Sequence, residues 1–246
     1  MTPSQETSAP PLFGGRLGTV PRVEGEPLSA SQAGITGRQS CSLPAVTLVL
    51  GGARSGKSRF AEALVEGAAE CGTYCATAEA LDDEMRARIA VHRARRDHGR
   101  RGAFWRTIET PLGLADTIAA EANPGRPLLI DCLTLWLSNL LAAEAPIDDA
   151  FAKLRGALGD AAGPIVLVAN EVGLGLVPET PLGRHFRDAA GRLNQEIASV
   201  ADRVVFVAAG LPLFLKGDPI SPGYFGIRPL TPTLSPDGGE GENKGG

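Results

Sequence analysis

The distribution of apolar residues divides the chain into a patterned middle and two unpatterned ends. Residues 1–45 and 217–246 are rich in Ser, Thr, Pro and Gly and show no sustained period, so we expect neither end to fill a core. We predict a disordered or non-native N-terminal extension over 1–45, a question that mass spectrometry of the protein from its natural source decides. We predict a low-complexity tail over 217–246. Residues 46–216 carry the pattern of a folded domain.

Short apolar runs alternate with stretches of helical spacing throughout this domain. The continuous run VTLVL at 46–50 is typical of a strand buried on both faces. The pattern predicts further strands over 72–77, 105–108, 127–132, 164–169 and 203–210. It predicts helices over 57–69, 81–96, 112–121, 133–143, 147–161 and 184–202. This alternation favours an α/β fold with a mostly parallel sheet flanked by helices.

A phosphate-binding motif stands between the first predicted strand and the helix after it. GGARSGKS at 51–58 satisfies the pattern G-x-x-x-x-G-K-[ST], and its position after a strand and before a helix is the context that the motif requires. In such a loop the lysine reaches the outer phosphates and the hydroxyl after it ligates Mg²⁺. We therefore predict a P-loop nucleotide site. Its loop contacts are Gly51, Gly52, Ala53, Arg54, Ser55, Gly56, Lys57 and Ser58, with Lys57 catalytic and Ser58 on the metal.

A second metal ligand is predicted at the end of a neighbouring strand. Asp131 follows the apolar run PLLI, which is where P-loop enzymes often place a carboxylate for Mg²⁺. The alternative is a capping role for the helix that begins at Leu133. The two roles are compatible.

His92 begins a dense basic segment in a chain whose net charge is −4. A solvated helix face would explain the arginines, and a packed histidine would explain His92. Arginines also neutralise a triphosphate well, and a neutral imidazole can attack phosphorus. The sharper hypothesis is therefore a nucleophilic His92, with His98 and His185 as rivals for that role.

The segment NEVGLGLVPET at 170–180 follows a predicted buried strand. Ligands of open α/β sheets bind beyond the carboxyl ends of the strands, so Asn170 and Glu171 are predicted to face that crevice. Gly173 and Gly175 would let this loop move or approach a ligand closely. A plain turn is the alternative.

Five segments together resemble one enzyme family, the bifunctional adenosylcobinamide kinase / adenosylcobinamide-phosphate guanylyltransferase of cobalamin biosynthesis. The resemblance runs through 46–216, and the long segment at 170–195 is much more specific than the phosphate loop. The segments are GGARSGKS at 51–58, ATAEALDDEM at 76–85, HRARR at 92–96, DCLTLWLSNLL at 131–141 and NEVGLGLVPETPLGRHFRDAAGRLNQ at 170–195.

This resemblance implies a RecA-like P-loop fold and two reactions. Such enzymes phosphorylate adenosylcobinamide with ATP or GTP. They then take GMP from GTP onto a histidine, which falls on His92 here, and pass it to the cobinamide phosphate to give adenosylcobinamide-GDP. The implied nucleotide contacts outside the phosphate loop are Ala76, Thr77, Ala78, Arg93, Ala94, Arg95, Arg96, Glu109 and Asp131.

The chain departs from the family pattern at one loop. DHGRRGAF at 97–104 separates the basic stretch from Trp105, so this loop is several residues longer than in the family and lacks its proline. The loop bears directly on the predicted contacts of Arg96 and Glu109.

The overall composition limits the classes of partner that the chain is expected to bind. The acidic balance, 28 Asp and Glu against 24 Lys and Arg, opposes a nucleic-acid role, and no apolar run reaches the length of a membrane span. Four cysteines without a CxxC pair and the absence of a secretory signal favour reduced thiols in the cytoplasm. We expect a corrinoid substrate and, by resemblance, a homo-oligomer that is a trimer.

Three other interpretations stay open at this point. In the first, the chain is a P-loop kinase of another small alcohol, His92 is structural, and no covalent GMP adduct forms. In the second, it is a nucleotide-switched binding module that docks an acidic partner. In the third, it retains only one of the two activities because of the longer loop.

Overall fold

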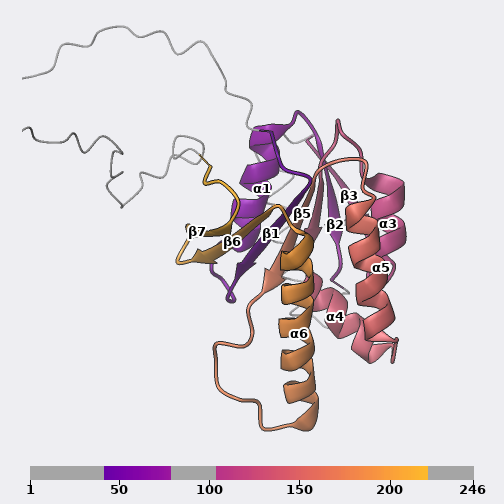
Figure 1. Cartoon of the computed structure of the whole chain (residues 1–246), viewed down its shortest axis with the longest axis vertical. Coiled ribbons are helices and arrows are strands. Elements are labelled where there is room, and N and C mark those ends of the chain that lie inside the picture. The colour runs from indigo at the N-terminus through magenta and orange to yellow at the C-terminus, as the bar shows by residue number, and fades with distance from the viewer. Residues whose placement is uncertain (1–41, 79–103, 221–246) are drawn as a thin grey trace, which may run out of the picture. The chain divides into compact units, whose positions relative to one another are not determined.

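The computed structural model describes residues 42–78 and 104–220 of the chain (Figure 1). The predicted helix over 81–96, residues 1–41 and residues 221–246 lie outside the described residues. Among the described residues, no helix is long and apolar enough to cross a membrane.

The strands are β1 Val46–Gly51, β2 Gly72–Ala76, β3 Trp105–Glu109, β4 Leu128–Asp131, β5 Ile165–Asn170, β6 Arg203–Ala208 and β7 Leu211–Lys216. The helices are α1 Lys57–Ala68, α3 Leu114–Glu121, α4 Leu133–Ala142, α5 Ile147–Gly159 and α6 Pro181–Val200.

The strands form one seven-stranded sheet in the order β3-β2-β4-β5-β1-β6-β7. Every neighbouring pair is parallel except β6 and β7, which are antiparallel. The predicted α/β fold with a mostly parallel sheet is therefore confirmed. Parallel pairing brings the carboxyl ends of β1 to β6 to one edge of the sheet, which is called the carboxyl edge below.

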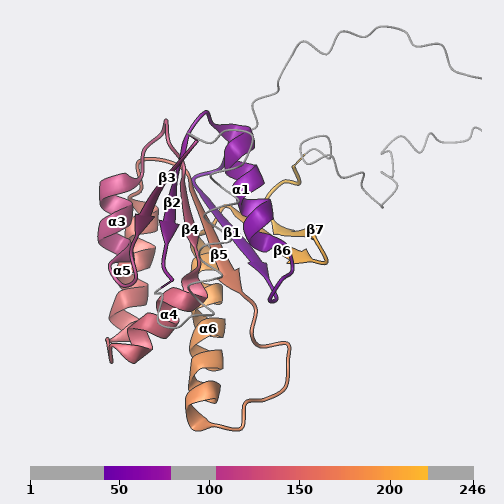
Figure 2. The same cartoon turned by 180° about the vertical axis from the view of Figure 1, so that it is seen from behind.

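Helices cover both faces of the sheet, as Figures 1 and 2 show from opposite sides. Alternate residues of each central strand face opposite ways, so Leu48 belongs to one apolar cluster and Val49 to the other. The first cluster packs α3, α4, α5 and α6 against the sheet through side chains such as Trp136 and Phe151. The second packs α1. Because both faces are buried, the central strands are apolar throughout, which is the pattern that predicted them.

The predicted strands and helices within the described residues are confirmed to within a few residues at each end. The largest difference is at α6, which begins at Pro181 instead of 184. Thr180 caps this helix, its hydroxyl accepting a hydrogen bond from Gly183 N at 3.1 Å, and proline is well suited to the first helical position.

Strand β7 was not predicted. It lies at an edge of the sheet, where Pro212 is tolerated because a backbone N–H is not needed on the outer side. Its leucines at 211, 213 and 215 are exposed, so burial did not impose a recognisable core pattern.

The turn from β1 into α1 is packed tightly against the end of β6. Gly210 N donates to Ser55 O at 2.8 Å. A Cβ on Gly51 would lie 2.5 Å from both Ser55 Oγ and Val207 O, and Gly56 has a φ of 97°, a left-handed conformation that favours glycine. Two of the motif's glycines are therefore required by the fold itself.

We predict that Gly51→Ala destabilises the protein by about 1–3 kcal/mol, because the backbone carbonyl of Val207 cannot move away without disturbing β6. Gly52→Ala is the matched control, since a Cβ there meets nothing within 4 Å. Chemical unfolding without nucleotide measures both variants. Equal stability of the two would contradict the packing argument.

Candidate nucleotide site at the carboxyl edge

Strand register places the predicted site residues along the carboxyl edge. Gly51 of β1 is paired with Asn170 of β5. Asp131 of β4 pairs with Val168 of β5 on one side and with Ala76 of β2 on the other. Glu109 ends β3 opposite Ala76. Strands are spaced by about 4.8 Å, so Asp131 lies about 10 Å across the sheet from the start of the phosphate loop.

The phosphate loop forms a turn that opens directly into α1. Lys57, the first residue of α1, is only 9% exposed, and its Nζ donates to Gly52 O at 3.2 Å. Ser55 N also donates to Gly52 O, at 3.3 Å, whereas Arg54 is exposed. A buried ammonium at the positive end of a 12-residue helix is a strong site for an anion.

Asp131 is held by a residue that was not predicted. Tyr74 of β2 is buried, and its hydroxyl donates to Asp131 Oδ2 at 2.9 Å. Tyr74 and Asp131 lie on neighbouring strands two positions out of register, which is a diagonal that a long side chain can span. Only the strand pairing reveals this contact, because the two residues are 57 positions apart.

The structure gives Thr77 a connecting role. Its fully buried hydroxyl bonds the backbone of Cys132 twice, donating to the carbonyl at 2.7 Å and accepting from the N–H at 2.8 Å. Asn139 Nδ2 of α4 donates to Thr77 O at 2.8 Å. These bonds hold the ends of β2 and β4 together. The Thr77 hydroxyl therefore has its hydrogen-bond partners within the protein and is not expected to bind the nucleotide. Its partly exposed neighbours Ala76 and Ala78 remain candidates for nucleotide contact.

Asn170 is fixed between β1 and β4 by two other side chains. Its N–H donates to Thr134 Oγ1 at 2.7 Å, and its carbonyl accepts from Asn194 Nδ2 of α6 at 3.3 Å. Within the described residues, Asn170 Oδ1 and Ser55 Oγ are buried without a hydrogen-bond partner. Buried polar atoms are nearly always paired, so both mark places where a ligand or water belongs. Asn170 was predicted to face this edge, whereas Thr134 and Asn194 gave no signal.

The described residues include only part of the predicted site. His92, Arg93, Ala94, Arg95, Arg96 and the rival His98 lie outside the described residues, and their roles stay predictions. His185 is exposed on α6. Glu109 is exposed on the edge strand β3, two strands beyond β4.

The donor set at this edge fits Mg²⁺. Ser58 and Asp131 offer a hydroxyl and a carboxylate, and Mg²⁺ prefers oxygen ligands and completes its shell with phosphates and water. Among the described residues no group of three or more His, Cys, Asp or Glu side chains could hold a metal by itself. Ser58 and Asp131 would supply two oxygen ligands, and Mg²⁺ would take the others from nucleotide phosphates and water.

Cys132, next to Asp131, is not a nucleophile at neutral pH. Burial raises the pKa of its thiol to about 11, with a further contribution from the negative charge of Asp131. Burial also raises the pKa of the Cys75 thiol to about 11. Both thiols therefore stay protonated and unreactive near pH 7.

Comparison with known families identifies the family of the chain. Residues 47–215 match the model of the family described as cobinamide kinase / cobinamide phosphate guanyltransferase. The chain belongs to that family. This confirms the resemblance drawn from the five sequence segments.

Curated relatives match the same part of the chain. The bifunctional adenosylcobalamin biosynthesis protein CobP of Pseudomonas aeruginosa is 53% identical over 175 residues, covering 70% of this chain and 98% of the relative. The corresponding protein CobU of Salmonella typhimurium is 44% identical over 184 residues, covering 69% and 98%. Among solved structures, the flagellar accessory protein FlaH of Methanocaldococcus jannaschii aligns with a TM-score of 0.44 and 15% identity, covering 74% of this chain and 82% of that one.

We predict that Lys57→Ala weakens binding of Mg-GTP about 10- to 100-fold, because a charge-assisted hydrogen bond contributes about 1.5–3 kcal/mol. Lys153→Ala, on the exposed side of α5, removes the same charge away from the loop and should leave binding unchanged. Calorimetric titration of folded protein measures both. Wild-type affinity in the Lys57 variant would rule out its role at the phosphates.

Proposed function

We propose that the carboxyl edge carries both reactions of the family in the cytoplasm. The protein phosphorylates adenosylcobinamide with ATP or GTP. It then transfers GMP from GTP, through a guanylyl-histidine, to adenosylcobinamide phosphate, which yields adenosylcobinamide-GDP. The observation that carries the proposal is the family match over 47–215, combined with the phosphate loop and Asp131 at one edge of the sheet.

Both reactions are displacements at phosphorus and differ in the atom attacked. In the kinase step the substrate hydroxyl oxygen bonds to the γ-phosphorus, its proton is lost, and the nucleoside diphosphate leaves. In the guanylyl step an imidazole nitrogen bonds to the α-phosphorus of GTP, and pyrophosphate leaves. A phosphate oxygen of adenosylcobinamide phosphate then attacks the same phosphorus and frees the histidine.

One set of groups serves both steps, since each must stabilise negative charge that spreads over phosphate oxygens. Lys57 and the backbone N–H groups at the start of α1 bind the outer phosphates. Ser58 and Asp131 would hold Mg²⁺, which neutralises the phosphates and draws charge from the leaving group. Tyr74 keeps the Asp131 carboxylate in place through its hydrogen bond.

We assign the nucleophile to His92, on the family motif HRARR at 92–96. The expected result is a covalent label on the protein after incubation with Mg²⁺ and GTP radiolabelled on the α-phosphate, followed by denaturing electrophoresis. The label should be acid-labile, stable to alkali and lost in His92→Ala, because a phosphoramidate has those stabilities. His185→Ala, at an exposed position of α6, should keep it.

The outcomes separate the competing functions. Absence of label on folded, GTP-binding parent protein, with kinase turnover intact, would identify a plain small-molecule kinase or a chain that lost one activity. Absence of both reactions with nucleotide binding intact would favour a nucleotide-switched binding module.

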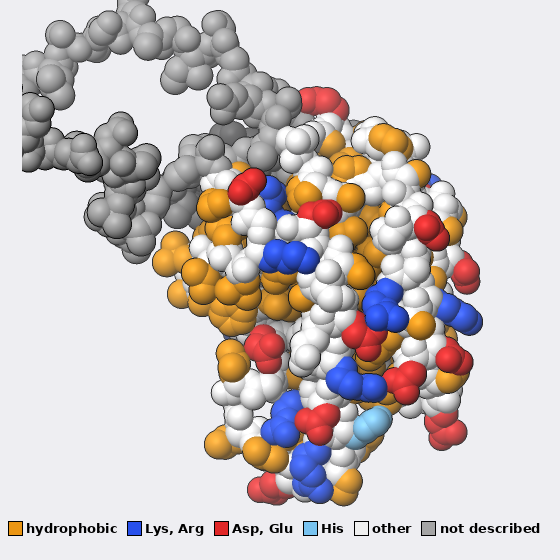
Figure 3. Space-filling model, viewed as in Figure 1, with side chains coloured by type: hydrophobic (Ala, Val, Ile, Leu, Met, Phe, Trp, Pro, Cys, Tyr) orange, Lys and Arg blue, Asp and Glu red, His pale blue; other side chains and the backbone are white. Residues whose placement is uncertain are grey.

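We also propose that the protein assembles as a trimer through β7. Leu211, Leu213 and Leu215 are exposed on this edge strand, and Leu213 pairs across the sheet with the half-buried Phe206. Figure 3 shows hydrophobic side chains gathered over β6 and β7. An exposed apolar edge strand is usually covered by a partner, and the trimer itself rests on the family resemblance.

Light scattering after size exclusion should give three times the chain mass, and Leu213→Lys should lower it by placing a charge in the interface. Leu112→Lys makes the same change at an exposed leucine outside β7 and should leave the mass unchanged. A monomeric parent protein would end this proposal.

A further inference from the structure

The loop between β5 and α6 presents apolar side chains at the carboxyl edge. Leu174, Leu176 and Val177 are 81%, 96% and 63% exposed, and Leu182 in the first turn of α6 is 69% exposed. Figures 1 and 2 show this loop running from the end of β5 beyond the sheet to the far end of α6. Four large apolar residues within nine positions are an unusual concentration of exposed side chains.

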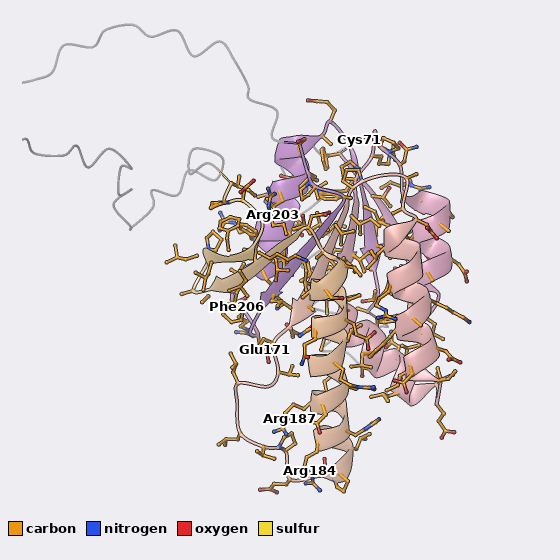
Figure 4. All side chains as sticks on the ribbon, viewed as in Figure 1. Cys71, Glu171, Arg184, Arg187, Arg203 and Phe206 are labelled. Atoms are coloured by element: carbon orange, nitrogen blue, oxygen red, sulfur yellow. The ribbon has the colours of Figure 1, made fainter. Side chains whose placement is uncertain are left out.

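Hydrogen bonds fix the loop at both ends, so the fold itself holds these apolar side chains at the surface. At its start, Glu171 N donates to Gly51 O of the phosphate loop at 3.1 Å, and Gly173 N donates to Glu171 Oε1 at 2.6 Å. At its end, Arg184 Nη1 donates to the carbonyls of Pro178 and Glu179 at 3.1 and 2.7 Å. Figure 4 shows Glu171 beside the end of β5 and Arg184 near the start of α6.

The charges of residues 171–182 do not favour a polyphosphate as the ligand, and the next cation, Arg184, donates to the carbonyls of Pro178 and Glu179. Residues 171–182 contain two carboxylates, Glu171 and Glu179, and no Lys or Arg. The cations that suit phosphates lie in the phosphate loop, at Arg54 and Lys57. The loop therefore suits an apolar or weakly cationic molecule that lies beside the nucleotide.

The second substrate of the family has this chemistry. Adenosylcobinamide is a cobalt-containing macrocycle whose rim carries methyl groups as well as amide side chains, and it is far larger than the hydroxyl or phosphate that reacts. Because the reacting end must reach the phosphates, the macrocycle must rest on protein surface next to the phosphate loop. The β5–α6 loop is joined to that loop by the Glu171 to Gly51 hydrogen bond.

We propose that Leu174, Leu176, Val177 and Leu182 form the surface that holds the corrinoid macrocycle, which is called the corrinoid platform below. This inference rests on the proposed function. The four apolar side chains of the platform pack against the methyl groups of the macrocycle, and the loop brings no cation that would repel its positive charge within residues 171–182. Binding energy from this remote part of the substrate then orients the reacting group at the nucleotide.

The test is the double variant Leu174→Ser, Leu176→Ser in the full chain, with adenosylcobinamide as substrate. We expect the KM for adenosylcobinamide to rise at least tenfold. Guanylylation of the enzyme by GTP alone should be unchanged, because that half-reaction needs no corrinoid. Equilibrium dialysis, read by the visible absorption of cobinamide, should show the same loss of affinity.

Val200→Ser is the matched control, since Val200 is an exposed apolar residue at the opposite end of α6. It should leave the KM unchanged. An unchanged KM in the double variant would overturn the platform, as would a loss of guanylylation or a change of oligomeric mass, which would assign the loop to the nucleotide or to self-association. Failure of the parent protein to turn over would instead contradict the proposed function.

Discussion

The close packing of Gly51 between Ser55 and the carbonyl of Val207 is the contact on which the nucleotide site depends. It brings the end of β1 against β6 with no room for a side chain, so the backbone turns at once toward α1. That turn places the nearly buried Lys57 at the start of α1. Its positive charge and the positive end of the helix dipole therefore attract an anion to the same position. A larger residue at 51 would separate these elements before any ligand arrived.

The parallel sheet then determines what surrounds this turn. Because β5 lies between β1 and β4, Asn170 stands between the phosphate loop and Asp131. Thr134 and Asn194 bind its backbone from two different helices, which leaves its side chain free to serve a ligand. Tyr74 fixes Asp131 from the other side. Polar side chains from three elements, α4, α6 and β2, thus hold the edge rigid, as charge stabilisation at phosphorus requires.

Strands buried on both faces and helices with one apolar face were predictable because burial gives their apolar residues a regular period. The phosphate loop was predictable because the spacing of its glycines and lysine, between a strand and a helix, is a known motif. Tyr74 and Thr134 were not predictable, since their partners lie 57 and 36 positions away and depend on strand pairing. Strand β7 was missed because three of its leucines face outward, contrary to the rule that apolar residues are buried.

The two exposed apolar surfaces differ in their surroundings, which is why we propose different partners for them. The leucines of β7 stand on the strand at the lateral edge of the sheet, which follows the turn whose Gly210 N donates to Ser55 O. We propose that a copy of the chain covers them. The loop that carries the corrinoid platform begins at Glu171, whose N–H donates to Gly51 O, and we propose that the molecule covering the platform lies beside the phosphates. A permanent protein partner there would crowd the substrate. A substrate that leaves after each turnover is compatible with leucines that stay exposed in the free enzyme.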